Sequence, residues 1–179
     1  MTYSRIARRI RVPLGFVLAA LYLWLARPTW LSIAIGGAVA LGGVALRAAA
    51  SGHITKNAAL TTTGPYAHTR NPLYLGSIII GAGFAVAALN WWIVLAIAVL
   101  FVAIYLPVIS SEEQLLRSTF PAFDDYARRV PRLWPRLRKG TTDSGSFSWN
   151  RYRKHREYNA LLGALAMISA LAVKLVWFR

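Results

Sequence analysis

The sequence predicts an all-α integral membrane protein with about five transmembrane helices and a cytoplasmic N-terminus. Three observations lead to this fold class. Hydrophobic residues make up 56% of the 179 residues, and the mean hydropathy of +0.45 is too high for a soluble domain of this size. The apolar residues form five separate blocks. The basic residues, which give a net charge of +15, lie between these blocks rather than on one polar face.

The five apolar blocks are long enough, or nearly so, to cross a hydrocarbon core of about 30 Å as helices. They comprise residues 12–26, 30–50, 73–89, 91–109 and 160–178. The first block follows a basic segment, as in a signal peptide, but no small-x-small cleavage site closes it, so we expect a retained helix. Asn90 alone separates the third block from the fourth, which predicts a tight antiparallel hairpin with Trp91 and Trp92 at the membrane interface.

Small residues four positions apart in the second and third blocks allow close helix contact. They form the rows Ser32, Gly36 and Ala40, Ala38 and Gly42, and Ser77, Gly81 and Ala85. The glycine- and serine-containing segment 138–150 has the composition of a flexible linker before the last block.

The distribution of basic residues predicts the orientation in the membrane. A cytoplasmic N-terminus places the four arginines before residue 12, Lys56, Arg70 and all eleven basic residues of segment 117–156 inside, and leaves Arg27 and Arg179 outside. The positive-inside rule therefore favours five spans with the C-terminus outside, in a bacterial inner membrane. Nearly all polar residues then fall into two cytoplasmic stretches, residues 51–72 and 110–159, which we expect to hold the active site.

The segment 63–76 is dense in turn formers and polar groups. Pro72 suits the first position of a helix, where its missing N–H has no intrahelical partner. The free N–H groups at such a helix start suit a carboxylate or phosphate, and the Arg70 guanidinium adds a fork of donors for the same anion. In the alternative interpretation, Arg70 only contacts lipid headgroups, and Tyr66 and Tyr74 only belong to the aromatic belt.

Two adjacent carboxylates, Glu112 and Glu113, follow the fourth block directly. Carboxylates at a membrane boundary are costly unless they are paired. Ser110 and Glu113 fit a capping box, which would begin a new helix after a kink at Pro107 but would leave Glu112 without a role. The hairpin of the third and fourth spans brings this pair to the same end as Arg70, so the two motifs together suit a ligand with both positive and negative groups.

Residues 120–135 mix aromatic residues, prolines and arginines, which predicts a short interfacial helix followed by an extended lid. Leu133, Trp134 and Phe120 could stack on a planar ring or lie on the membrane surface. We expect no metal site, because the chain has no cysteine and because His53 and His155 lack companion ligands. We also expect no nucleic-acid partner, since the basic residues are interpreted as topology signals and contacts with the lipid bilayer.

The order of the motifs over residues 60–135 resembles the isoprenylcysteine carboxyl methyltransferase and phospholipid methyltransferase superfamily, in its small prokaryotic form. The shared pattern is Gly-Pro-Tyr, Arg-x-Pro-x-Tyr-x-Gly, Glu-Glu, Phe-x-x-Tyr and Val-Pro-Arg-x-x-Pro. The resemblance implies an S-adenosylmethionine-dependent methyltransferase that binds its cofactor at the cytoplasmic ends of the helices. We therefore expect one membrane domain over residues 1–179. Its parts are two N-terminal spans (1–50), a cofactor-binding core with spans three and four and the lid (51–139), and a linker with the last span (140–179).

The resemblance also implies roles for individual residues. The cofactor-binding positions carried over by motif are Ala58, Ala59, Leu60, Thr61, Tyr66, Asn71, Pro72, Leu73, Tyr74, Glu112 and Glu113. Residues 58–61 would enclose the cofactor mainly through their backbone, and the residues from 66 to 74 would contact its amino-acid end. Glu112 or Glu113 would pair with its ammonium group, and Leu133 and Trp134 are weaker candidates for the wall of the adenine site.

The expected reaction is an in-line displacement of a methyl group from sulfonium to a hydrophobic acceptor presented from the bilayer. Arg70 and His68 are the candidate catalytic residues, Arg70 as the donor fork for an anion and His68 as the nearest titratable base for an amine or thiol acceptor. A carboxylate acceptor would need no base, and His68 would then be a loop residue without a role.

Two departures from the family pattern bear on the acceptor. Asn71 replaces the usual histidine, which keeps hydrogen bonding but removes titration. Pro107, Val108 and Ile109 stand where prenylcysteine enzymes carry an arginine for the substrate carboxylate. A lipid amine, a small thiol or another hydrophobic acceptor therefore remains open. The alternatives to a methyltransferase are an NADPH-dependent membrane reductase of the steroid-reductase type and a non-catalytic protein that binds lipid or cofactor.

Overall fold

The computed structural model describes residues 17–54, 59–136 and 146–177, and this part of the chain is helical with no strands. Residues 17–25 form a first helical segment. The elements that follow are α2 (Trp30–His53), the 3₁₀ turn η1 (Gly64–Ala67), α3 (Pro72–Ala88), α4 (Trp91–Leu100), the π-helical turn η2 (Phe101–Tyr105), α5 (Leu106–Thr119), α6 (Phe123–Arg129), α7 (Trp149–Lys154) and α8 (Tyr158–Trp177). The predicted all-α class is confirmed.

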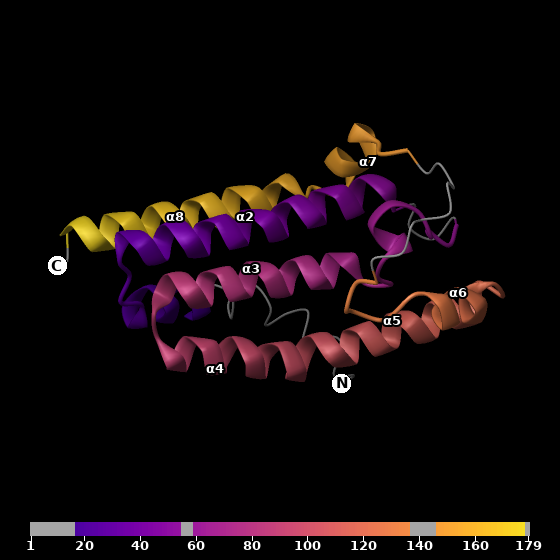
Figure 1. The fold of residues 1–179 in the computed structure, drawn as a ribbon, viewed down its shortest axis with the longest axis horizontal. Coiled ribbons are helices and arrows are strands. Elements are labelled where there is room, and N and C mark those ends of the chain that lie inside the picture. The colour runs from indigo at the N-terminus through magenta and orange to yellow at the C-terminus, as the bar shows by residue number, and fades with distance from the viewer. Residues whose placement is uncertain (1–16, 55–58, 137–145, 178–179) are drawn as a thin grey trace.

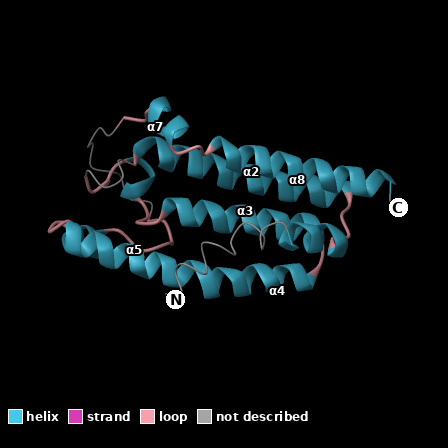
Figure 2. Ribbon diagram, turned by 180° about the vertical axis from the view of Figure 1, so that it is seen from behind, coloured by secondary structure: helices cyan, strands magenta, loops and turns pink. Residues whose placement is uncertain are grey.

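The long helices lie side by side along one axis (Figure 1). Helix α8 runs beside α2, and α3 lies between α2 and the rod formed by α4, η2 and α5, an order that the reverse view also shows (Figure 2). The short elements η1, α6 and α7 gather at one end, and the C-terminus lies at the other (Figure 1). The described parts of the two polar stretches, residues 51–72 and 110–159, therefore meet at the same end, as the sequence predicted.

Three described helices are long and apolar enough to cross a membrane. They are α2, with 24 residues, the continuous rod Trp91–Thr119, with 29, and α8, with 20. Helix α3 is a shorter apolar helix of 17 residues. The predicted first span begins outside the described residues, so the count of five spans and their orientation stay predictions.

Helices α2 and α3 touch through glycines, which lets their backbones approach closely. A Cβ at Gly43 would lie 2.6 Å from the Gly76 carbonyl oxygen, and one at Gly83 would lie 2.5 Å from the Ala40 nitrogen. The predicted row of Ser32, Gly36 and Ala40 is buried here. In the other rows, Gly42 faces open space and Gly81 faces Ile97 of α4, whereas Ser77 contacts Arg47 of α2.

The predicted hairpin between the third and fourth blocks is confirmed. Helix α3 ends at Ala88, and Leu89, the next residue, adopts a left-handed conformation with φ of 49°. Asn90 then caps α4, because its side-chain oxygen accepts a hydrogen bond from the Trp92 backbone N–H at 2.9 Å. Trp91 and Trp92 are both well exposed beside this turn.

The predicted helix start at Ser110 is wrong. The helix continues from α4 through η2 into α5, and the Ser110 hydroxyl donates to the Leu106 carbonyl instead of capping a helix. Pro107 is accommodated without a break, because the turn before it widens so that the Leu106 N–H bonds to the Phe101 carbonyl. The carboxylate pair therefore stands on a rigid extension of the spanning rod.

Candidate active site

Glu113, on α5, connects three segments at the end of the bundle where η1, α6 and α7 lie. Its Oε1 accepts a hydrogen bond from Asn71 Nδ2 at 3.0 Å and lies 3.4 Å from Arg70 Nε. Its Oε2 lies 3.3 Å from Arg132 Nε. The side chains of Arg70 and Glu113 are each only 15% exposed, so their attraction is weakly screened by water. The start of α3, the rod and the segment after α6 are thereby held by one carboxylate.

Glu112 has different surroundings. It is exposed, and its Oε1 accepts a hydrogen bond from the Tyr74 hydroxyl at 2.8 Å. The Tyr74 ring packs edge-on against Tyr105 of η2, with ring centroids 5.6 Å apart. Within the described residues no cation pairs with Glu112, so its charge faces outward. Tyr74 and Glu112 thus form a second contact between α3 and α5 beside the first.

The segment 130–136, which follows α6, lies across the connection from η1 to α3. Four hydrogen bonds hold it there: Arg70 N to Pro131 O (2.9 Å), Arg136 N to His68 O (3.0 Å), Thr69 Oγ1 to Arg132 O (3.2 Å) and Asn71 Nδ2 to Arg132 O (3.1 Å). The predicted short helix followed by an extended lid is present at this place. The backbone of the lid is thereby held against the residues that immediately precede α3.

Tyr66 of η1 is buried beneath α6. The Tyr126 hydroxyl donates to the Tyr66 carbonyl oxygen at 2.7 Å. Burial raises the pKa of both phenols. At Tyr66 the negative charges of Glu112 and Glu157 also raise the pKa, whereas at Tyr126 the Arg70 charge lowers it. Both phenols therefore stay neutral at physiological pH and serve as hydrogen-bonding groups.

The other predicted site residues lie around this cluster. Pro72 is buried at the start of α3. His68 Nδ1 lies 3.0 Å from the Arg136 carbonyl oxygen, which ties the ring to the lid. Ala58 falls outside the described residues, and the neighbouring positions Ala59, Leu60 and Thr61 are exposed or partly buried in the segment that leads into η1. Backbone hydrogen bonds hold the lid in place. The Trp134 side chain is 81% exposed, so Trp134 covers no site in this structure.

Sequence reasoning missed an ion pair beside the site. Arg47 of α2 meets Glu157, just before α8, through Nε to Oε2 at 3.0 Å and Nη2 to Oε1 at 2.9 Å. Its Nη1 also donates to Ser77 Oγ at 2.6 Å and to the Leu73 carbonyl oxygen at 3.3 Å. A Cβ at Gly76 would lie 2.6 Å from Arg47 Cγ. The glycine of the Arg-x-Pro-x-Tyr-x-Gly pattern therefore makes room for this arginine.

A usable signal for this pair was present in the sequence. Arg47 is a charged residue inside an apolar block, and such a charge needs a partner within the bundle. The partner itself was not predictable, because Glu157 lies 110 residues away at the end of a linker. The pair fixes the first turn of α3, which carries Leu73 and Tyr74, against both α2 and α8.

A cavity of about 310 Å³ lies beside this ion pair. Its lining comprises Arg47, Ser77, Ile80, Gly81, Phe84, Tyr105, Ala160, Gly163 and Ala164. Arg47, Ser77 and Tyr105 supply polar groups, and the rest is apolar or small. Because Tyr105 also contacts Tyr74, the cavity adjoins the carboxylate pair. The site thus has a charged region at the end of the bundle and an apolar space that extends along the helices.

Comparison with known proteins gives one family and two curated relatives. A family model described as phospholipid methyltransferase matches residues 10–122, a stretch that includes the start of α3 and the carboxylate pair. Nickel-cobalt-cadmium resistance protein NccN of Alcaligenes xylosoxydans xylosoxydans is 42% identical over 103 residues, which are 53% of this chain and 47% of the relative. Cobalt-zinc-cadmium resistance protein CzcN of Cupriavidus metallidurans is 37% identical over 139 residues, which are 71% of this chain and 62% of the relative.

The chain spans about half to three fifths of the length of these relatives. No solved structure matches it.

Proposed function

The chain belongs to the phospholipid methyltransferase family, and on this premise we propose that it transfers a methyl group from S-adenosylmethionine to a hydrophobic acceptor that arrives from the bilayer. The observation that carries the proposal is the meeting of Arg70, Asn71 and Tyr74 with the pair Glu112 and Glu113. This arrangement offers both signs of charge within one small region. We place the region on the cytoplasmic side, because the basic residues concentrate at this end.

The residues present fit this cofactor. The Nε atoms of Arg70 and Arg132 are buried and make no hydrogen bond of good geometry to any described residue, although both face Glu113. Buried against Glu113, these two atoms are not open to a ligand, so we propose that the terminal nitrogens of the Arg70 guanidinium bind the carboxylate of the cofactor. Glu112 carries an exposed negative charge suited to an ammonium group. S-adenosylmethionine, when bound, supplies an electrophilic methyl group on its sulfonium.

The two glutamates take different roles in this proposal. Glu113 already serves Asn71, Arg70 and Arg132, so it holds the lid and the helix start together. Glu112 binds the cationic group of the cofactor, with Tyr74 orienting its carboxylate. The sequence left open which of the two glutamates binds the cofactor, and this division is our proposal for it.

The cavity beside Arg47 is the proposed place for the body of the acceptor. Its walls are apolar, its polar end adjoins Tyr74 through Tyr105, and a Cβ at Gly163 would meet no atom within 4 Å. We propose that the protein contributes mainly by positioning the acceptor and by holding it in apolar surroundings. His68 remains the candidate base for an amine or thiol acceptor, through the ring nitrogen that does not face the lid.

The names of the relatives, which are metal resistance proteins, suggest the biological role that this activity serves. No three His, Asp or Glu side chains in the described ranges lie together as a metal site would require, and the chain has no cysteine. We therefore propose that the chain supports metal resistance by methylating a membrane component or a small hydrophobic molecule, not by holding the metal itself. Metal tolerance of a deletion strain complemented with the parent, but not with Glu112→Gln, would support this role, and equal complementation would contradict it.

Cofactor binding by the purified chain tests the proposed function. We expect the parent, in detergent, to bind tritiated S-adenosylmethionine saturably and to show no saturable binding of NADPH. Binding of NADPH without S-adenosylmethionine would replace the proposal with the reductase alternative. Cofactor binding without methyl transfer to any membrane extract would favour the non-catalytic alternative.

A further inference from the structure

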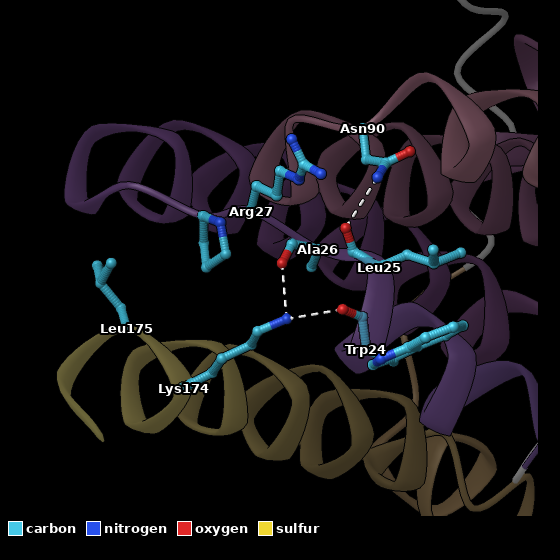
Figure 3. A pocket seen from close by; sticks show the side chains of 8 residues that line it. Trp24, Leu25, Ala26, Arg27, Asn90, Lys174 and Leu175 are labelled. Atoms are coloured by element: carbon cyan, nitrogen blue, oxygen red, sulfur yellow. Dashed lines mark hydrogen bonds between the residues drawn. The ribbon is translucent and has the colours of Figure 1, made fainter. Parts of the chain in front are cut away.

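A second and larger cavity, of about 520 Å³, lies at the end of the bundle opposite the candidate active site. It is bounded by residues 24–28, by Asn90 in the turn between α3 and α4, and by Lys174 and Leu175 near the end of α8 (Figure 3). Its lining includes two basic residues, Arg27 and Lys174, and no acidic residue. The proposed methyltransferase reaction uses none of these residues.

Lys174 fixes one positive charge in the cavity wall. Its amine donates to the carbonyl oxygens of Leu23, Trp24 and Ala26, at the C-terminal end of the first helical segment. Figure 3 shows the contacts with Trp24 and Ala26. These contacts offset the cost of a charge inside an apolar helix, because a helix C-terminus carries partial negative charge. All three amine hydrogens are used in this way. Lys174 therefore contributes electrostatic attraction rather than hydrogen bonds to a ligand.

Arg27 supplies the free donors. Its backbone N–H donates to the Ala88 carbonyl oxygen at 2.8 Å, which holds the residue at the cavity. Its side chain is exposed, and the part of the chain that the structure describes provides no ion-pair partner for its guanidinium. A guanidinium is a planar fork of donors that matches a phosphate. One cavity thus combines a fixed charge with an available anion-binding side chain.

The depth of the cavity in the membrane follows from the tryptophans around it. Five tryptophans at this end are each more than half exposed: Trp24, Trp30, Trp91, Trp92 and Trp177. Exposed tryptophans mark the level of the lipid headgroups. Basic residues are unexpected at this end, because the distribution of charge assigns it to the outside. Their presence in one cavity at headgroup depth makes this cavity suited to an anionic ligand.

We propose that this cavity binds the headgroup phosphate of an anionic phospholipid from the leaflet at that end. The Arg27 guanidinium donates hydrogen bonds to the phosphate. The charge of Lys174 favours a headgroup with net negative charge over a zwitterionic one. The acyl chains lie along the exposed apolar surface of α8 and the first helical segment. The proposal is independent of the methyltransferase reaction.

Native mass spectrometry of the full chain, released from nanodiscs of equal phosphatidylglycerol and phosphatidylethanolamine, tests this site. We expect the parent to retain phosphatidylglycerol in preference by about fivefold, as one basic contact at the surface provides. Arg27→Gln should lower this preference while still folding, because the Arg27 side chain is exposed and forms no ion pair with a described residue. Arg128→Gln, an exposed basic residue on α6 at the other end, is the matched control and should keep it.

Three results would overturn the proposal. They are equal retention of both lipids by the parent, an unchanged preference in Arg27→Gln, and an equal loss in Arg128→Gln, which would show that net charge alone selects the lipid.

Discussion

Glu112 and Glu113 are adjacent in the chain, but only Glu113 is enclosed by partners. We expect Glu112→Gln to weaken S-adenosylmethionine binding about tenfold or more, since it removes a charge-assisted contact, with little change in stability. Glu113→Gln should lower the free energy of unfolding by roughly 2 kcal/mol, less than for a fully buried pair because the Arg132 side chain is 37% exposed. Cofactor titration and thermal unfolding of each variant measure the two effects.

Asp125→Asn is the matched control for this comparison. Asp125 pairs with Arg128 on the exposed face of α6, where the aspartate side chain is 74% exposed, so the change should alter neither quantity. A loss of affinity in Glu113→Gln without loss of stability, together with normal affinity in Glu112→Gln, would reverse the assigned roles.

The residues of the candidate site were largely predictable, because they lie in dense motifs on two neighbouring spans. Arg70, Asn71, Tyr74 and the glutamate pair do come together. The Arg47–Glu157 pair was not predicted, since pairing across 110 residues depends on how α8 returns to α2. Lys174 was missed for a similar reason: its backbone partners belong to the opposite end of the sequence.

Among the elements, α2 offers two adjacent glycines with opposite surroundings. A Cβ at Gly43 would lie 2.6 Å from the Gly76 carbonyl oxygen, whereas one at Gly42 would meet nothing within 4 Å. Gly43→Leu should therefore force α2 away from α3 and cost about 1–3 kcal/mol, while Gly42→Leu should leave stability unchanged or slightly raised. Thermal unfolding in one detergent compares the two variants. Equal melting temperatures would show that α2 and α3 do not pack as described.

The cavity beside α8 gives a second prediction at this scale. Gly163→Leu should fill the cavity without a clash and lower the rate of methyl transfer at least about tenfold, since the acceptor loses its space, while cofactor affinity stays unchanged. Gly42→Leu, the same change on an exposed face, should keep the parent rate. Unchanged transfer by Gly163→Leu would place the acceptor elsewhere.

The order of the helices was predicted from the sequence, but the continuous connection from α4 into α5 was not. Asn90 predicted the hairpin correctly. A single polar residue between two apolar runs is too short for anything but a tight turn between antiparallel helices. Pro107 and Ser110 indicated a helix break, yet the rod continues. A π-helical turn absorbs the missing N–H of proline within the helix, and composition alone does not reveal such a turn.

At the scale of the whole molecule, the concentration of charge at one end predicts the orientation. The chain has no cysteine, so single cysteines can be introduced without removing any. In intact bacterial cells, a membrane-impermeant maleimide should label Trp91→Cys, at the start of α4, and should label Arg153→Cys, on α7, only after the cells are opened. The reverse pattern would place the candidate active site outside the cytoplasm.

The central claim is that the chain is a methyltransferase whose acceptor lies in the membrane. The most direct test is to incubate native membranes that contain the parent chain with methyl-labelled S-adenosylmethionine, to extract the label with organic solvent and to identify the labelled product. We expect label in one hydrophobic product with the parent, and a strong reduction in membranes that contain Glu112→Gln. Incorporation no greater than in membranes that lack the chain would contradict it.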